Sequence, residues 1–164
     1  MDLGIAGKTA LVTGSSKGLG LGTAKALAAE GCNVAINGRD AGRLEAAARL
    51  VPGALPLVGD LSEPGTPTAL VDATIERFGG LDILVANAGG PPAAGALEVD
   101  DDALRAAFEQ NLLASIRLVR AALPTMRAAG WGRIVCITSV TVKEPIPALA
   151  ASNATRVGLW GWAK

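Results

Sequence analysis

Glycines and a lysine follow the first apolar run of the chain in a pattern typical of phosphate binding. The segment reads Thr13-Gly14-Ser15-Ser16-Lys17-Gly18-Leu19-Gly20. It lies between an apolar run at 9–12 and an Ala-rich stretch at 21–29, so the expected order is strand, turn and helix. Glycines let the backbone approach a bulky anion, and the amino end of the helix directs its N–H groups and positive dipole at the same place. The segment therefore predicts a turn for a pyrophosphate, with a ligand-free tight loop as the alternative.

The end of the next predicted strand bears on the choice of dinucleotide. Asn37 takes the place where a carboxylate would hold a ribose 2′-hydroxyl and repel a 2′-phosphate. Arg39 follows it, and Lys17 lies in the glycine turn, so two cations are expected to converge. That arrangement favours NADP(H) over NAD(H) as the cofactor. In the alternative interpretation Arg39 is a solvated surface charge and Asp40 caps the next helix.

Two further strand ends carry polar side chains that could border the same ligand. Asp60 and Leu61 follow the run 55–58, and the Asp60 carboxylate could accept a hydrogen bond from an adenine amino group. The alternative is that Asp60 caps a helix that begins near residue 62 or 63. The segment Asn87-Ala88-Gly89 follows the run 81–86. Asn87 could bridge neighbouring strand ends while Gly89 leaves room for a ligand, although such a sequence is also typical of an ordinary turn.

Apolar strand-like runs alternate with Ala-rich helical ones along the whole chain. Strands are expected near 8–13, 32–37, 55–58, 81–86 and 132–138, and helices near 18–30, 40–51, 64–78, 101–129 and 148–164. Right-handed crossovers then give a doubly wound parallel sheet of the Rossmann type with strand order 3-2-1-4-5. The prediction is an α/β fold in which residues 1–164 form a single dinucleotide-binding domain.

Composition excludes several classes of function. Lys plus Arg number 15 and Asp plus Glu number 15, and only 3% of residues are aromatic, so neither charge nor base stacking favours nucleic acid. The chain has no His, which excludes His-based triads and His metal sites, and no metal site is predicted. No signal peptide and no run of about 18 apolar residues is visible, so no membrane association is expected. Cys32 and Cys136 fall at predicted strands roughly 14 Å apart, beyond disulfide reach, which suits a reducing cytoplasm.

Taken in order, these motifs resemble the short-chain dehydrogenase/reductase family over essentially the full length of the chain. The matching residues are Thr13-Gly14-x-x-x-Gly18-x-Gly20, Asp60, Asn87-Ala88-Gly89, Asn111 and Ser139. The segment after the second strand, Asn37 to Asp40, resembles the 3-oxoacyl-carrier-protein reductase-like branch. The resemblance implies an oxidoreductase that transfers a hydride between NADP(H) and a carbonyl or alcohol substrate, with a 3-oxoacyl thioester as one candidate. It also implies a homo-oligomer, a dimer or tetramer, paired through the helices 101–129 and 148–164.

The resemblance assigns chemistry to four positions, and two of them depart from the family. Asn111 would hold a proton-relay water, and the Ser139 hydroxyl would donate to the substrate oxygen. The family's Tyr-x-x-x-Lys falls on Ser152 and Arg156, and no Tyr occurs anywhere in the chain. Arg156 could still grip ribose hydroxyls, whereas an aliphatic hydroxyl is a poor general acid near neutral pH. A water held by Ser152, Ser139 and Arg156 is the predicted substitute.

The last residues lead to two further expectations. The chain stops inside the helix that carries Ser152 and Arg156, whereas family members continue into further strands and a lid. The domain is therefore expected to be truncated at its C-terminal side, or covered by a partner along the open edge of the strand 132–138. Trp160 and Trp162 are expected to be core or interface residues. The alternative function is a dinucleotide-binding pseudoenzyme or sensor that has lost the tyrosine acid.

Overall fold

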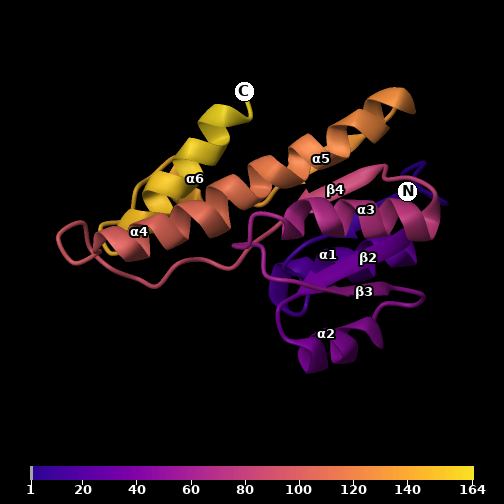
Figure 1. Ribbon diagram of the computed structural model, residues 1–164, viewed down its shortest axis with the longest axis horizontal. Helices are drawn as coiled ribbons and strands as arrows, with labels where there is room; N and C mark the ends of the chain where they lie inside the picture. The colour runs from indigo at the N-terminus through magenta and orange to yellow at the C-terminus, as the bar shows by residue number, and fades with distance from the viewer. Residues whose placement is uncertain (1) are drawn as a thin grey trace.

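Five parallel strands form one sheet in the order β3-β2-β1-β4-β5 in the computed structural model, which describes residues 2–164 (Figure 1). The strands are β1 (Thr9–Val12), β2 (Asn33–Gly38), β3 (Leu55–Val58), β4 (Ile83–Ala86) and β5 (Arg133–Cys136). The predicted strand order and fold class are confirmed. Residue pairs such as Leu11 with Ala35 and Leu11 with Leu84 fix the central register. At the outer side of β5, Val135 is half exposed, and β5 pairs with β4 alone within residues 2–164.

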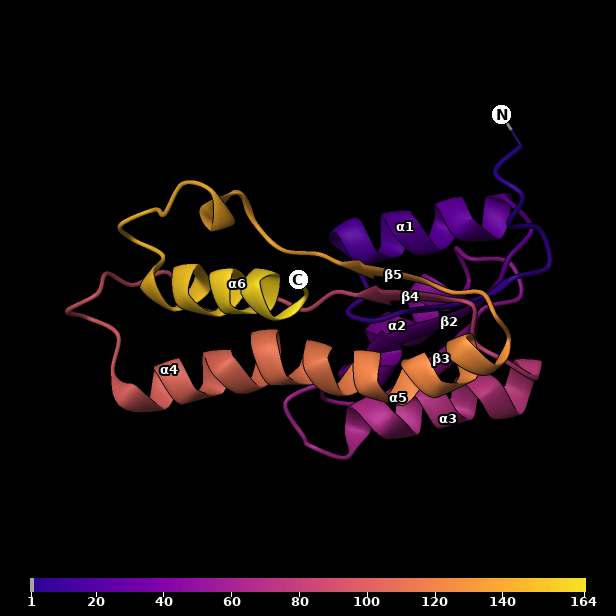
Figure 2. The same ribbon diagram turned by 90° about the horizontal axis from the view of Figure 1, so that it is seen from above.

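Alternate residues of each strand face opposite layers of helices. The helices are α1 (Gly18–Ala29), α2 (Ala41–Ala48), α3 (Thr66–Phe78), α4 (Asp101–Phe108), α5 (Ala114–Ala128) and α6 (Ala150–Trp162). Ala10 and Val12 pack in one apolar cluster with α1 and α2, whereas Leu11 packs in a second cluster with α3 and α5. Figure 2 shows α1 on one face of the sheet and α3 and α5 on the other. The sheet is therefore buried on both faces, as its continuous apolar strands require.

The predicted helix 40–51 is shorter in the structure. The Asp40 carboxylate caps α2 by accepting from the Arg43 amide at 2.8 Å, as one of the two interpretations proposed. The helix ends at Ala48, because the Leu50 and Val51 amides bond to carbonyls only three residues back. Such tight bonds close a helix end, and Gly53 with φ +71° then reverses the chain toward β3. Apolar periodicity therefore overestimated the length of this helix.

The predicted helix 101–129 is divided by a π-helical turn. This turn, Glu109–Leu113, follows α4 and leads directly into α5, so the three segments form one long rod. Figure 2 shows this rod running along the sheet and beyond it, with α4 and α6 side by side outside the sheet. π-Helical turns are rare in proteins, and those that occur are often found at functional sites. The residues of this turn are therefore candidates for a functional role. None of the helices within residues 2–164 combines the length and apolarity needed to cross a membrane.

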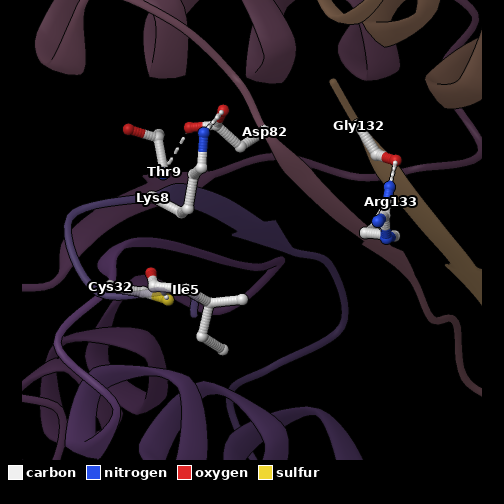
Figure 3. Close-up of polar contacts among 7 residues, drawn as sticks. All are labelled: Ile5, Lys8, Thr9, Cys32, Asp82, Gly132 and Arg133. Atoms are coloured by element: carbon white, nitrogen blue, oxygen red, sulfur yellow. Dashed lines mark hydrogen bonds and ion pairs between the residues drawn. The ribbon is translucent and has the colours of Figure 1, made fainter. Parts of the chain in front are cut away.

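Paired charges close the amino edge of the sheet, where β1, β4 and β5 begin. Lys8 Nζ lies 3.1 Å from Asp82 Oδ1, and Asp82 Oδ2 accepts from the Thr9 amide at 2.9 Å (Figure 3). Two cations approach the Trp131 ring, with Lys8 Nζ 4.4 Å and Arg133 Cζ 4.7 Å from its centroid. The contacts of Asp82 with Lys8 and Thr9 join segments that are more than seventy residues apart in the sequence.

Both cysteines are unpaired, as their predicted separation requires. Cys136 ends β5, whereas Cys32 lies just before β2 rather than within it. The Cys32 thiol donates to Ile5 O at 3.3 Å (Figure 3). Burial raises the pKa of both thiols. Neither thiol therefore has the electropositive surroundings that favour a reactive thiolate.

Candidate functional site

Three glycines shape the turn between β1 and α1, two through their backbone conformation and one through close packing. Gly14 and Gly18 have φ values of +55° and +57°, a left-handed conformation that glycine adopts without strain. Gly20 lies inside α1, where a Cβ atom would meet Gly14 O at 2.5 Å and Ser15 Cα at 2.8 Å. Only glycine allows this close approach. The turn is therefore held in a shape that leaves the amides at the start of α1 unobstructed.

Asn87 ties the end of β4 to the glycine turn. The side-chain Nδ2 donates to Gly14 O at 3.0 Å and to Thr13 O at 3.2 Å. Thr13 Oγ1 donates to Asn87 O at 2.8 Å and accepts from the Asn87 amide at 2.9 Å. The predicted bridge between neighbouring strand ends is present, and Asn87 stabilises the turn by bonding to its backbone carbonyls.

Ser15 and Asn37 join the carboxyl ends of β1, β2 and β3. The buried Ser15 hydroxyl donates to Val12 O at 2.6 Å and accepts from the Asn37 amide at 2.9 Å. Asn37 is 1% exposed, and its Nδ2 donates to Leu57 O and Gly59 O, each at 3.1 Å. The hydrogen-bonding groups of both side chains are thus satisfied within the protein. Sequence reasoning identified the place of Asn37 but missed this bridging role.

A cleft of about 150 Å³ opens above the carboxyl edge of the sheet. Its walls are Gly14, Ser16, Lys17, Asn37, Gly38, Arg39, Gly59, Asp60, Leu61, Ala88, Gly89 and Gln110. The structure thus brings together eight predicted cofactor residues from four segments of the chain: Gly14, Ser16, Lys17, Arg39, Asp60, Leu61, Ala88 and Gly89. The other predicted cofactor residues, Ser15, Gly18, Leu19, Gly20 and Asn87, shape the turn or lie outside the cleft wall. Gln110 was missed, and its only sequence signal is that it precedes Asn111.

The two predicted cations face one cleft together with a carboxylate. Lys17 and Arg39 both line it, and Arg39 Nη1 lies 3.5 Å from Asp60 Oδ2. The Arg39 side chain is 67% exposed, so this pair is weak and open to exchange for another anion. An anionic group entering here would meet two cations and a single carboxylate, an arrangement that favours a phosphate.

Asp60 closes a short turn instead of capping a helix. Its Oδ1 accepts from the Ser62 amide at 2.9 Å and from the Ser62 hydroxyl at 2.7 Å, while α3 begins only at Thr66. The helix-cap interpretation is therefore wrong. Burial alone would raise the pKa of Asp60, but the hydrogen bonds from Ser62 and the Arg39 guanidinium outweigh it and hold the pKa below its ordinary value. The carboxylate stays ionised beside the cleft.

Asn111 lies in the π-helical turn and is completely buried. Neither its Nδ2 nor its Oδ1 has a hydrogen-bond partner within residues 2–164. Buried amides are almost always paired, so two unpaired atoms on one side chain call for a partner such as a water or a ligand. A polar side chain in the middle of a helix would ordinarily be expected to face solvent, and Asn111 does not. Its role in holding a relay water stays a prediction.

Ser139, Ser152 and Arg156 gather where β5 ends and α6 begins. Ser139 precedes a 3₁₀ turn at Val140–Val142 and caps it, since its hydroxyl accepts from the Thr141 amide at 3.2 Å. Ser152 and Arg156 are one turn apart on the buried face of α6. Arg156 Nη1 donates to Ile137 O at 2.8 Å, and burial lowers the pKa of the guanidinium. None of the four predicted catalytic residues lines the cleft.

Ala88 connects this second group of residues to the cleft. It lines the cleft wall, and its carbonyl accepts from Arg156 Nη2 at 3.4 Å. The two groups are therefore neighbours along one edge of the sheet. Trp160 and Trp162, further along α6, are 52% and 40% exposed, so they are not core residues, and their place in an interface stays a prediction.

Comparisons with known proteins agree with this geometry. A family model described as short chain dehydrogenase matches residues 8–164. D-beta-hydroxybutyrate dehydrogenase from Cupriavidus necator is 37% identical over 165 residues, which cover 96% of this chain and 63% of that protein. L-fucose dehydrogenase from Bos taurus is 34% identical over 154 residues, covering 91% of this chain and 57% of that protein.

A solved structure shows the same arrangement of elements. L-sorbose reductase from Gluconobacter frateurii, complexed with NADPH and L-sorbose, matches with a TM-score of 0.94 and 35% identity. The match covers 99% of this chain and 64% of that one. The chain therefore spans less than two thirds of the length of each of these relatives.

Proposed function

Because the chain belongs to the short-chain dehydrogenase family, we propose that it is an NADP(H)-dependent oxidoreductase acting on a carbonyl or alcohol substrate. The cleft at the carboxyl edge carries this proposal, since it combines a glycine turn with Ser16, Lys17 and Arg39. When bound, the nicotinamide would exchange a hydride with the substrate carbon. A 3-oxoacyl thioester is the first substrate to test, followed by small hydroxy acids and sugars of the kind that the relatives' names indicate.

The residues of the cleft fit a dinucleotide phosphate. A Cβ at Gly14 or Gly20 would meet the protein's own atoms, Asn87 O at 2.8 Å or Gly14 O at 2.5 Å. Glycine therefore allows the tightly packed turn that would present its backbone N–H groups to the pyrophosphate. Lys17 and Arg39 would hold the 2′-phosphate. Arg39 would then leave its ion pair with Asp60 and pair with the doubly charged phosphate. Asp60 and Leu61 would border the adenine, and Ala88 and Gly89 the ribose.

At the neighbouring group, Ser139 would donate its hydroxyl to the substrate oxygen. Ser152 would orient a water that supplies the proton, with Asn111 connecting that water to solvent. A positioned general acid typically contributes about 10²–10⁴-fold in rate, so this arrangement predicts slow turnover. The second candidate function, a nucleotide-binding pseudoenzyme or sensor, is favoured by one observation: the chain has no Tyr to act as the acid.

Self-association is part of the same proposal. Trp160 and Val157 expose large apolar side chains on α6, beside α4. Two copies pairing through these helices would cover them. Sedimentation equilibrium measures this directly, and a monomer at all concentrations would contradict it.

Cofactor choice is tested by titrating the protein with NADPH and NADH. We expect NADPH to bind more tightly than NADH. In Arg39→Ala we expect the affinity for NADPH to fall by about 10–100-fold and the affinity for NADH to stay unchanged, because a charge-assisted contact to the 2′-phosphate is lost. Arg43→Ala is the matched control, since Arg43 is exposed and lies outside the cleft wall. Equal affinity of the wild type for both cofactors would remove the support for NADP(H).

Turnover separates the two candidate functions. NADPH oxidation with simple ketones and 3-oxoacyl thioesters is compared for the wild type, Ser152→Ala and the double variant Ser152→Tyr/Arg156→Lys. We expect slow oxidation by the wild type and a further loss in Ser152→Ala. At saturating NADPH we expect a gain in the double variant, because a restored phenol acid contributes about 10²–10⁴-fold in rate. Tight NADPH binding with no oxidation by any of the three would favour the sensor.

A further inference from the structure

The hydrogen-bond ladder between β4 and β5 follows a regular alternation up to Ile137. The Arg133 amide donates to Asp82 O at 2.9 Å at the start of the ladder, and the Ile137 amide donates to Ala86 O at 2.9 Å at its end. In a parallel ladder the next bond would run from the Ala88 amide back to Ile137 O. The structure departs from the pattern at this point.

The Arg156 guanidinium takes the place of that bond. Ile137 O accepts from Arg156 Nη1 at 2.8 Å, and Ala88 O accepts from Nη2 at 3.4 Å. The backbone of β4 has meanwhile turned toward β1, where Asn87 is held by Thr13. One planar side chain therefore connects two strand ends whose backbones no longer bond to each other.

The burial of Arg156 shows that this is a structural contact as well as a source of charge. The residue is 6% exposed and forms no ion pair with a carboxylate among the described residues. A buried cation without a counter-ion needs hydrogen-bond acceptors. Here two backbone carbonyls accept from Nη1 and Nη2, whereas Nε has no partner among the described residues. A lysine ammonium is a single point donor without the planar fork that spans two carbonyls.

We infer that Arg156 is a positioning residue that replaces the last rung between β4 and β5 and fixes Ala88, beside the cofactor cleft, relative to Ser139. Ile137 is two residues before Ser139, and Ala88 lies in the cleft wall, so the guanidinium sets the spacing between the two parts of the site. The consequence for ligand binding rests on the proposed NADP(H) site. The structural part of the inference does not.

Amide hydrogen exchange of Ile137 tests the structural part. In Arg156→Met and in Arg156→Lys we expect the Ile137 amide to exchange about tenfold faster, because the end of the ladder frays. The Arg133 amide, at the other end of the same ladder, is the internal control and is expected to keep its rate. The exposed Arg49 supplies the matched variant, Arg49→Lys.

Two outcomes would overturn the inference. Unchanged exchange at Ile137 in both variants would show that the guanidinium fixes nothing. Full restoration of the wild-type rate in Arg156→Lys would show that only the charge is needed. If neither variant folds, NMR of the wild type decides: resolved, slowly exchanging Nη protons on Arg156 but not on Arg49 support the rung, and averaged ones contradict it.

Binding distinguishes failure of the inference from failure of the proposed function. NADPH and 2′,5′-ADP, which lacks the nicotinamide half, are titrated into wild type and Arg156→Lys. We expect NADPH to lose at least about fivefold more affinity than 2′,5′-ADP, because Ser139 and Ala88 lose their spacing. Equal losses would refute the link to the site. A wild type that binds neither ligand would refute the proposed function, and the exchange result would stand independently.

Discussion

At the amino edge of the sheet, Asp82 uses both carboxylate oxygens, one on Lys8 and one on the Thr9 amide, and Trp131 is covered by two cations. At the carboxyl edge, both side-chain amide atoms of Asn111 lack a partner within residues 2–164. The cleft cation Arg39 forms only a weak, exposed ion pair with Asp60. The same strands thus end in a closed set of interactions on one side and an open set on the other.

The difference indicates that the carboxyl edge of the sheet is less stable than the amino edge. Paired groups at the amino edge hold three strands together and leave nothing for a ligand. Unpaired groups at the carboxyl edge are unfavourable in the free protein, and the proposed ligand or a water bound there would satisfy them. Substitutions at the amino edge should therefore change stability alone, and substitutions at the carboxyl edge should change binding, in some cases with a gain in stability.

The largest effect is expected at the carboxyl edge for Gly20→Ala. The new Cβ would lie 2.5 Å from Gly14 O, so the backbone of the glycine turn must move. We expect a loss of about 2–3 kcal/mol in NADPH binding, about 100-fold in affinity. Titration with NADPH measures it.

Gly22→Ala, two residues further along α1, is the matched control. A Cβ there meets nothing within 4 Å, so binding should be unchanged and the helix stabilised by about 0.5–1 kcal/mol. Wild-type affinity in Gly20→Ala would show that the cradle does not hold a phosphate.

Asp82→Ala breaks the amino edge. It leaves the nearly buried Thr9 amide without an acceptor and removes the partner of Lys8. We expect the free energy of unfolding to fall by about 1–3 kcal/mol, measured by urea denaturation, with no change in NADPH affinity. If the variant is fully folded and still binds NADPH more weakly than the wild type, the claim that the amino edge affects stability alone is contradicted.

Asn111→Leu should move stability in the opposite direction. Leucine has the same number and branching of side-chain heavy atoms, and it removes two buried polar atoms that have no partner in the described chain. We expect a gain of about 1 kcal/mol in the free energy of unfolding, together with loss of any turnover. The conservative Ser115→Ala, also in the buried face of the rod, is the control and should give no gain. A destabilised Asn111→Leu would mean that the amide has a partner in solution.

The smallest effect is the acid dependence contributed by Asp60. Its folded pKa lies below its ordinary value of about 3.9, so the ionised carboxylate stabilises the protein above that pH. This contribution is lost as the pH falls through the folded pKa. We expect the difference in Tm between wild type and Asp60→Asn to shrink from about pH 5 to about pH 3. A difference that grows on acidification would reverse the sign of the shift.

Local patterns were enough to predict the sheet. Alternating apolar runs and helices fix a doubly wound topology, because right-handed crossovers leave few alternatives. Boundaries were less certain where tertiary contacts decide them, as at Ala48, where α2 tightens and stops. The π-helical turn was not predicted, since the apolar spacing of 101–129 suits one continuous α-helix.

The cleft residues of the glycine turn were predictable because they are adjacent in sequence and carry glycine. Gln110 and the carbonyl partners of Arg156 were not, because they depend on where a distant helix meets the sheet. The same holds for Trp131 and Lys8, which no local pattern connects. Sequence reasoning identifies a residue's chemistry more readily than its partners.

The cations around Trp131 have an optical consequence. With three Trp and no Tyr, the near-ultraviolet emission of the chain comes almost entirely from Trp131, Trp160 and Trp162. The Trp131 indole emits in the field of Lys8 and Arg133, at 4.4 Å and 4.7 Å, whereas Trp160 is 52% exposed to water. A Trp131→Phe difference spectrum therefore isolates light from the amino edge, and the remaining emission reports on α6. The chain therefore carries separate intrinsic fluorophores at the amino edge of the sheet and on α6.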